Sequence, residues 1–165
     1  MRMRQLPRSM SSDGFDMINR QILQILQKEG RITNVELAER VGIPATSMSD
    51  RIRRLQDEGI ISSFGAVLNP MKVGLSLLVF IEIRLDNATP QVFEKFAKAV
   101  NTAPEVIECH MVGGGFDYLV KTRFGSMESY RTFLGMVVLN WPGVSGTNTY
   151  VVLEEIKQNA PLAVI

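Results

Sequence analysis

The sequence is poor in the residues that build disulfides, metal sites and many catalytic centres. It contains one cysteine, Cys109, and one histidine, His110, among 165 residues. A single cysteine excludes an internal disulfide, and one Cys with one His does not supply a zinc site. The two are neighbours on an expected strand, so their side chains point to opposite faces and cannot form a nucleophile–base pair. We therefore expect no metal, no cofactor and no enzymatic activity, and an inert buried thiol at Cys109.

Long apolar runs are also missing. The longest apolar stretch, Leu75 to Ile83, is interrupted by Ser76 and Glu82 and is far shorter than the ~18 residues needed to span a bilayer. The basic residues near the N-terminus are not followed by an apolar segment of signal-peptide length. We expect a cytoplasmic protein that does not bind membranes.

No charge of one sign dominates. The formal net charge is +1, with +2 on residues 1–65 and −1 on residues 66–165. Any nucleic-acid function must therefore be argued from local patterning. The length allows one domain or two small ones.

The N-terminal third predicts three short helices. Residues 1–14 are polar and predict a flexible arm, which is either simply disordered or touches DNA phosphates. Asp16 is a good N-cap for a first helix, and Thr33 with Glu36 forms a capping box for a second. Gly42-Ile43-Pro44 ends the second helix, and a third runs from about Thr46 to Glu58.

The three helices, residues 15–61, predict a helix-turn-helix DNA-binding domain. Residues Ile60 to Leu68 are expected to be extended, with a turn at Asn69-Pro70. Three helices followed by a strand pair are typical of the winged form. Residues 62–74 are accordingly expected to be a wing or hinge linker.

The third helix is the candidate DNA-reading element. Met48, Ile52 and Leu55 lie on one face of a helical wheel. The planar guanidinium of arginine can donate two hydrogen bonds to a guanine edge or to a phosphate. An α-helix fits the width of the major groove of DNA. The alternative is a solvated amphipathic helix in which Asp50 pairs with Arg54 one turn later. The candidate DNA-binding residues on the other faces are Thr46, Ser47, Ser49, Asp50, Arg51, Arg53 and Arg54.

Residues 75–165 predict an α/β domain. The expected order is a strand alternating from Leu77, a helix opened by Pro90, strands over 106–112 and 116–124, a helix from Ser126 to Leu139, and a strand over 144–153. This order is that of the ferredoxin-like βαββαβ unit. The fold class is therefore α+β, with an N-terminal winged helix-turn-helix and a C-terminal ferredoxin-like domain.

The string Gly113-Gly114-Gly115 is the expected turn between two of these strands. A phosphate-binding loop would need a following helix, and a strand follows here. Two interpretations stay open: a tight hairpin, or bare amides that bind a small carboxylate as an anion nest does. In the second, Asp117 would accept the ligand's ammonium group, so the ligand would be an amino acid.

The first strand of this domain is apolar on both faces. Leu77, Val79 and Ile81 can pack on helices, whereas Leu78 and Phe80 face the other way, together with Tyr150 and Val152 from the last strand. Leaving that second face wet is costly. Either another subunit or loops of the same chain must cover it.

Several strings resemble the Lrp/AsnC family of bacterial and archaeal regulators, from Phe15 to Leu162. The opening and second helices carry Phe15-Asp16-Met17-Ile18 and Gly30-Arg31-Ile32-Thr33, and the third ends in Arg51-Ile52-Arg53-Arg54-Leu55. The sensing domain carries Phe116-Asp117-Tyr118-Leu119-Val120 and Thr149-Tyr150-Val151-Val152-Leu153. Two positions depart from the family pattern: Asn19 replaces an acid, which we expect to affect only helix capping, and Gly115 replaces a polar residue.

The resemblance implies homodimers formed through the C-terminal sheets, which assemble into octamers or similar species. It also implies an amino-acid effector, held between dimers near the hairpin after the second strand. The matching effector-binding positions are Met111, Gly113, Gly114, Asp117, Met127, Leu139, Tyr150, Val151 and Val152.

The leading hypothesis is a sequence-specific transcriptional regulator of amino-acid metabolism that binds double-stranded DNA and senses a small amino acid. A second hypothesis is an architectural DNA-compacting protein without an effector. A small enzyme on the same scaffold is a third, although no activated nucleophile, metal cluster or carboxylate pair is visible in the sequence.

Overall fold

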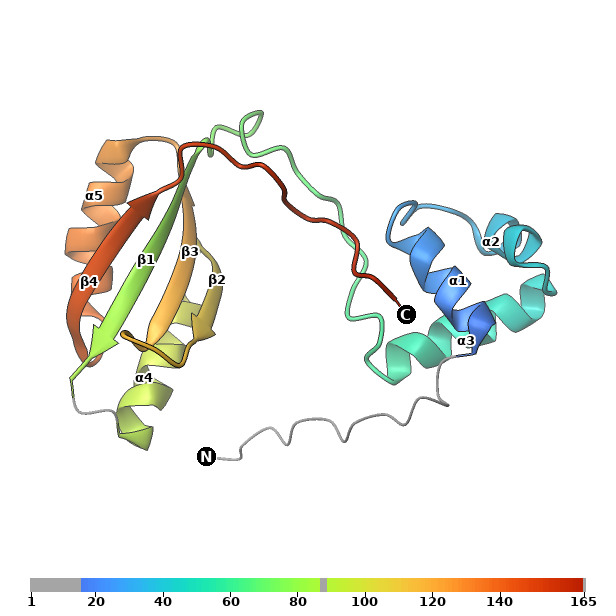
Figure 1. Ribbon diagram of the computed structural model, residues 1–165, viewed down its shortest axis with the longest axis horizontal. Coiled ribbons are helices and arrows are strands. Elements are labelled where there is room, and N and C mark those ends of the chain that lie inside the picture. Colours follow the sequence, from blue (N-terminus) through green and yellow to red (C-terminus); the bar gives the residue numbers. More distant parts are fainter. Residues whose placement is uncertain (1–15, 87–88, 165) are drawn as a thin grey trace. The chain divides into compact units, whose positions relative to one another are not determined.

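The computed structural model describes residues 16–86 and 89–164, which divide into two units. The helical unit comprises residues up to Val67 together with the tail from Lys157, and the sheet unit comprises Leu68–Ile156. The predicted arm, residues 1–14, lies outside the described residues. Figure 1 labels the elements of both units.

The helical unit contains α1 (Met17–Leu26), α2 (Asn34–Val41) and α3 (Ala45–Asp57). The predicted caps are confirmed: the Asn19 amide donates to Asp16 Oδ1 at 2.6 Å, and both halves of the Thr33–Glu36 capping box form. Gly42 ends α2 with φ of 78°, a left-handed conformation that glycine adopts without strain. Local side-chain chemistry therefore sets where α1 and α2 begin.

One apolar cluster holds the three helices together. The inward face of α3 is the one predicted, because Met48, Ile52 and Leu55 are buried. These side chains meet those of α1 and α2, and the buried members of the cluster are Ile22, Leu23, Leu37, Ala38, Met48, Ile52 and Leu55. The opposite face of α3 is left to solvent.

The expected strand over residues 60–68 does not form. Between α3 and Leu77, the described chain has a turn at residues 70–74 but no strand. Asn69 Oδ1 accepts from the amides of Met71 and Lys72, which confirms the predicted turn. A strand needs a pairing partner, and this segment finds none within its own unit.

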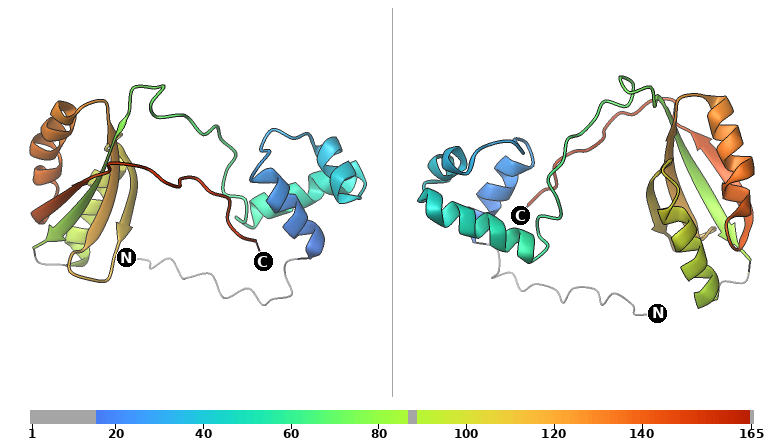
Figure 2. Two further views of the ribbon diagram at one scale, coloured as in Figure 1. Left: turned by 45° about the horizontal axis from the view of Figure 1, so that its top comes forward. Right: turned by 180° about the vertical axis from the view of Figure 1, so that it is seen from behind.

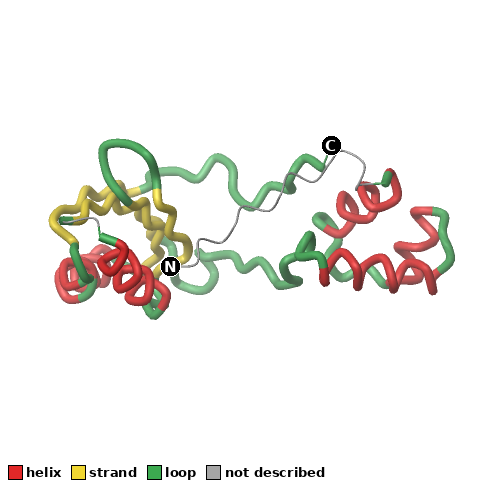
Figure 3. The backbone as a smooth tube through the Cα atoms, turned by 90° about the horizontal axis from the view of Figure 1, so that it is seen from below, coloured by secondary structure: helices red, strands yellow, loops and turns green. Residues whose placement is uncertain are grey.

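The sheet unit has the predicted βαββαβ order. Its elements are β1 (Leu77–Leu85), α4 (Pro90–Asn101), β2 (Val106–Met111), β3 (Tyr118–Phe124), α5 (Met127–Met136), a short 3₁₀ turn (Val138–Asn140) and β4 (Val144–Val151). The antiparallel sheet runs β2-β3-β1-β4. Both helices cover one face and leave the other open (Figures 2 and 3).

The covered face of the sheet is fully buried at its centre. Val79, Ile81 and Ile83 are 0% exposed and pack against rings from both helices and from Trp141. The predicted helix to Leu139 is too long, since α5 ends at Met136 and a 3₁₀ turn follows. β3 likewise begins at Tyr118, two residues later than expected.

Candidate DNA interface and effector site

The outward face of α3 carries two arginines that reach solvent. The side chains of Arg53 and Arg54 are 75% and 59% exposed. Arg53 Nη2 lies 3.3 Å from Asp50 Oδ1, and Arg54 Nε lies 3.8 Å from Glu58 Oε1. The pairing predicted between Asp50 and Arg54 is therefore wrong; Asp50 pairs one residue earlier. Both contacts join exposed neighbours on one helix, a class of ion pair worth only ~0–1 kcal/mol.

Arg51 occupies a different place from the other two arginines. Its Nη1 donates to Asp16 Oδ2 at 2.6 Å and to Asn19 Oδ1 at 2.9 Å, and its side chain is 25% exposed. Asn19 itself is buried, so its role extends beyond the capping effect expected from the sequence. The guanidinium of Arg51 thus ties α3 to the start of α1.

Asp16 serves two partners at once. The hydrogen bond from the Asn19 amide, followed by the bond from Arg51, lowers the pKa of the Asp16 carboxyl below its usual value. The charged form is favoured because both groups donate to it. This carboxylate therefore caps α1 and anchors α3 together.

The hydroxyl residues of α3 lie near its N-terminal end. Ser49 Oγ accepts from Asn34 Nδ2 at 3.1 Å, so it bridges α2 and α3. Thr46 and Ser47 are exposed. A shallow concavity of about 560 Å³ lies on this face, lined by Ser47, Asp50, Arg51, Arg53, Arg54 and Asp57.

The glycine loop between β2 and β3 is open on its outside. A Cβ at Gly113, Gly114 or Gly115 would meet nothing within 4 Å. None of the three has a positive φ, whereas an anion nest built from alternating αR and αL residues needs one. A nest of the αR-αL type is therefore not present at these glycines, whereas a nest of the turn type and the tight hairpin both remain predictions.

Asp117 has a structural partner that the sequence did not reveal. Its Oδ2 accepts from the backbone amide of Leu85 at 2.7 Å, and its own amide donates to Ile83 at 2.9 Å. These bonds fasten the β2–β3 loop to the end of β1, where the pairing with β4 is irregular. The other oxygen of this carboxylate, Oδ1, has no hydrogen bond among the described residues. It is therefore the oxygen that could accept from a ligand ammonium group.

The other predicted effector residues fall on both faces of the sheet. Tyr150 pairs across from Phe80 on the open face, whereas Val151 pairs across from Val79 on the covered face. Met127 and Leu139 belong to the helical layer. Met111, Met127, Leu139, Tyr150 and Val151 are exposed, while Val152 is partly buried. The described chain therefore places them on different surfaces of the sheet unit.

The open face of the sheet is partly apolar and carries a polar pair. Leu78 is 4% exposed, so the chain itself already covers it, and Phe80 is half-buried. Tyr150 donates to Glu82 Oε1 at 2.9 Å, and Asn148 Nδ2 donates to Glu82 Oε2 at 3.1 Å. The bond to Glu82 raises the pKa of Tyr150.

Cys109 and His110 point to opposite sides of β2, as predicted. Cys109 packs on the core, and burial raises its pKa to about 11. His110 lies outside, with Nε2 at 3.2 Å from Glu108 Oε2. Within residues 16–86 and 89–164, no three side chains of the metal-binding types come together. None of the helices in that same range has the length and apolar character to cross a bilayer.

Each unit of the chain matches a model of a known protein family. A model of winged helix-turn-helix DNA-binding domains matches residues 15–62, and one of the Lrp/AsnC ligand-binding domain matches residues 78–162. The leucine-responsive regulatory proteins of Klebsiella pneumoniae and Escherichia coli strain K12 are each 51% identical over 149 residues, which is 90% of this chain and 91% of theirs.

Solved structures of transcriptional regulators superpose on this chain. A Neisseria meningitidis transcriptional regulator in complex with L-methionine superposes with a TM-score of 0.84 at 36% identity, over 90% of this chain and 96% of that one. An AsnC-family regulator from Agrobacterium tumefaciens gives the same score and coverage at 28% identity.

The α3 geometry and these matches define a DNA-binding transcriptional regulator with a separate ligand-binding domain. This is a class of regulators and not of enzymes. The chain belongs to the Lrp/AsnC family.

Proposed function

We propose that this regulator reads specific sites in double-stranded DNA upstream of genes of amino-acid metabolism, in the cytoplasm, through the outward face of α3. The observation that carries this proposal is the placement of Arg53 and Arg54 on the face opposite Met48, Ile52 and Leu55. Their weak exposed ion pairs are easily exchanged for contacts with phosphate or guanine.

The remaining polar residues of α3 have two roles: some can contact DNA, and others hold the helix in position. Thr46 and Ser47 are exposed and can donate to phosphates or base edges. Asp50 can accept from a cytosine amino group once Arg53 turns to the DNA. Arg51 and Ser49 hold α3 against α1 and α2, so we assign them a positioning role.

The test is fluorescence anisotropy with DNA from upstream of the protein's own gene and a shuffled control of equal length. Specific binding should exceed binding to the shuffled duplex by at least ~10³-fold at physiological salt. Equal affinity for the two duplexes would contradict the proposal and favour a DNA-compacting protein.

We further propose that the ligand is a small amino acid. Three observations support this: the match to a ligand-binding domain, the L-methionine complex of the Neisseria relative, and the open loop with the free Oδ1 of Asp117. Calorimetry against the twenty amino acids tests it. A flat result across all twenty would remove the effector.

The split of the effector residues over two faces supports a site that needs more than one copy of the chain. We propose that homodimers form over the open face around Phe80 and Tyr150, and that dimers assemble to an octamer or a similar species. Light scattering with Tyr150→Asp tests this, since a buried charge at that face should shift the mass toward the monomer. An unchanged mass would place the interface elsewhere.

A further inference from the structure

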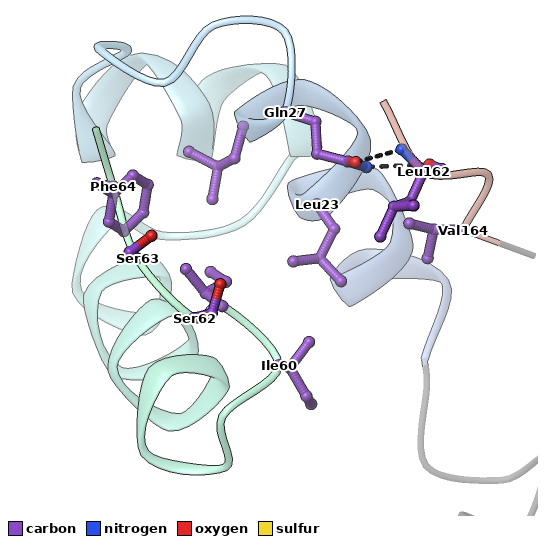
Figure 4. Close-up of a pocket in the computed structure, with 10 residues that line it drawn as sticks. Leu23, Gln27, Ile60, Ser62, Ser63, Phe64, Leu162 and Val164 are labelled. Atoms are coloured by element: carbon purple, nitrogen blue, oxygen red, sulfur yellow. Dashed lines mark hydrogen bonds between the residues drawn. The ribbon is translucent and has the colours of Figure 1, made fainter. Parts of the chain in front are cut away.

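The C-terminal residues of the chain lie against α1 of the helical unit. The Leu162 amide donates to Gln27 Oε1 at 2.6 Å, and Gln27 Nε2 donates back to the Leu162 carbonyl at 3.2 Å. Gln24 Nε2 adds a bond of 3.4 Å to the Val164 carbonyl. Figure 4 shows the paired bonds of Gln27 and the neighbouring apolar side chains. One side-chain amide thus satisfies both backbone groups of a residue 135 positions away.

The tail lies at the edge of an apolar groove. The groove has a volume of about 350 Å³, and its walls come from α1, from the segment that follows α3, and from the tail itself. Val164 is half-buried against the core cluster of the helical unit, whereas the side chain of Leu162 stays mostly exposed. The lining residues are Leu23, Leu26, Gln27, Ile60, Ile61, Ser62, Ser63, Phe64, Leu162 and Val164.

The groove is made of surface that the three helices alone do not cover. Ile60 and Ile61 are only partly buried, and Phe64 is 49% exposed. Apolar surface left in water costs about 25 cal/mol per Å². Packing of Val164 on this surface therefore adds stability to a unit with a small core, and the hydrogen bonds of Gln27 and Gln24 hold the segment in place.

A second anchor holds the other end of the tail. Arg123 Nη2 lies 2.6 Å from both carboxylate oxygens of Glu155, and Arg123 Nη1 donates to the Leu75 carbonyl at 3.3 Å. The Arg123 side chain is only 10% exposed. The guanidinium of Arg123 therefore holds two segments at once: Leu75, which precedes β1, and Glu155, which follows β4.

The tail is the shorter of the two connections between these anchors. The chain from Glu155 to Leu162 reaches at most ~25 Å when fully extended, whereas the chain from Phe64 to Leu75 reaches ~40 Å.

We propose that the groove beside α1 is the docking site of the chain's own C-terminal tail, and that the docked tail stabilises α1 and through it the DNA-reading helix. The route to α3 is short. α1 carries Gln27 at its C-terminal end and Asp16 and Asn19 at its N-terminal end, and the last two hold Arg51 of α3. The DNA part of this inference rests on the proposed function; the docking part does not.

A double-mutant cycle on the full chain tests the docking. The four proteins are the intact chain and a chain ending at Gln158, each with and without Gln27→Ala, and amide hydrogen exchange of α1 is the readout. Gln21→Ala is the matched control, since Gln21 is exposed on the same helix. We expect truncation to speed exchange in α1 about tenfold. Gln27→Ala should speed it about threefold in the intact chain and not at all in the truncated one.

The same proteins are then titrated with DNA from upstream of their own gene. We expect Gln27→Ala to weaken binding only when the tail is present. An equal effect of Gln27→Ala in both chain lengths, or α1 exchange unchanged by truncation, would overturn the docking. A coupling seen in exchange together with an equal preference for shuffled DNA would overturn the proposed function and leave the docking standing.

Discussion

Each of the two units of this protein is stabilised by a different kind of core. The sheet unit has a core of contacting aromatic rings, in which Phe96 lies 4.4 Å from Tyr118 and 5.6 Å from Trp141 between ring centroids. The core cluster of the helical unit contains aliphatic side chains and Met48, and it is joined by caps, one Arg51–Asp16 ion pair and the tail. The sheet unit therefore depends on a large aromatic core, whereas the helical unit depends on a small aliphatic core and on polar contacts between its helices.

The largest expected effect breaks the sheet unit alone. Phe96→Ala removes a fully buried ring and should lower the free energy of unfolding of that unit by about 3–5 kcal/mol. The single tryptophan, Trp141, is buried in the same core, so its fluorescence in urea reports this unit. Ile107→Ala, at an exposed position of β2, is the control and should cost far less. Equal losses in the two variants would contradict the aromatic-core account.

The next effect separates the two roles of Asp117. Asp117→Ala leaves the Leu85 amide without its acceptor and should cost about 1–3 kcal/mol. Asp117→Asn keeps an oxygen there and should cost less than that. If the carboxylate also binds an ammonium group, Asp117→Asn should still lose at least ~10-fold in calorimetric affinity for the amino acid. Retained affinity in a folded Asp117→Asn protein would remove this residue from the effector site.

The sequence predicted best what depends on near neighbours. The caps at Asp16 and Thr33 and the inward face of α3 follow from residues a few positions apart, where local chemistry decides the outcome. The order of strands and helices along the sheet unit likewise follows from local patterns of apolar residues. Patterns of near neighbours did not predict the hydrogen-bond partners of Arg51, Asp117 and Leu162. Their partners lie 35, 32 and 135 positions away, and only the folded chain brings them together.

Missing or competing partners also explain why the structure differs from the sequence at other positions. The segment 60–68 has strand-like residues, but a strand needs a partner that its own unit does not offer. Asp50 had two arginines within reach, and the choice between them depends on side-chain geometry that spacing does not fix. The effector residues stay a prediction because one chain places them on two faces of a sheet.

A smaller effect concerns a single cap of the helical unit. Thr33→Ala removes the acceptor for the Glu36 amide and should lower the stability of the helical unit by about 1 kcal/mol. Helix circular dichroism during urea unfolding measures it, with Thr33→Ser as the variant that retains the cap. An equal loss in the serine variant would mean that the hydroxyl is not the stabilising group.

The smallest expected effect is one of pH. The folded pKa of Asp16 lies below its ordinary value because the Asn19 amide and Arg51 donate to the carboxylate. Its contribution to stability is therefore complete above the unfolded pKa, about 3.9, and is lost as pH falls through the folded value. Asp16→Asn can still cap α1 but not pair as an anion. It should flatten the acid dependence of helical-unit stability, and an unchanged acid limb would contradict this account.

Specific DNA binding by this protein depends on contacts between DNA and the outward arginines of α3. The most direct measurement is the salt dependence of binding to the protein's own upstream DNA for Arg54→Ala, beside the intact protein. We predict weaker binding, a salt slope reduced by about 1, and unchanged unfolding of the helical unit. An affinity and a slope equal to those of the intact protein would show that Arg54 makes no contact, and the same result for Arg53→Ala would remove α3 as the DNA-reading element.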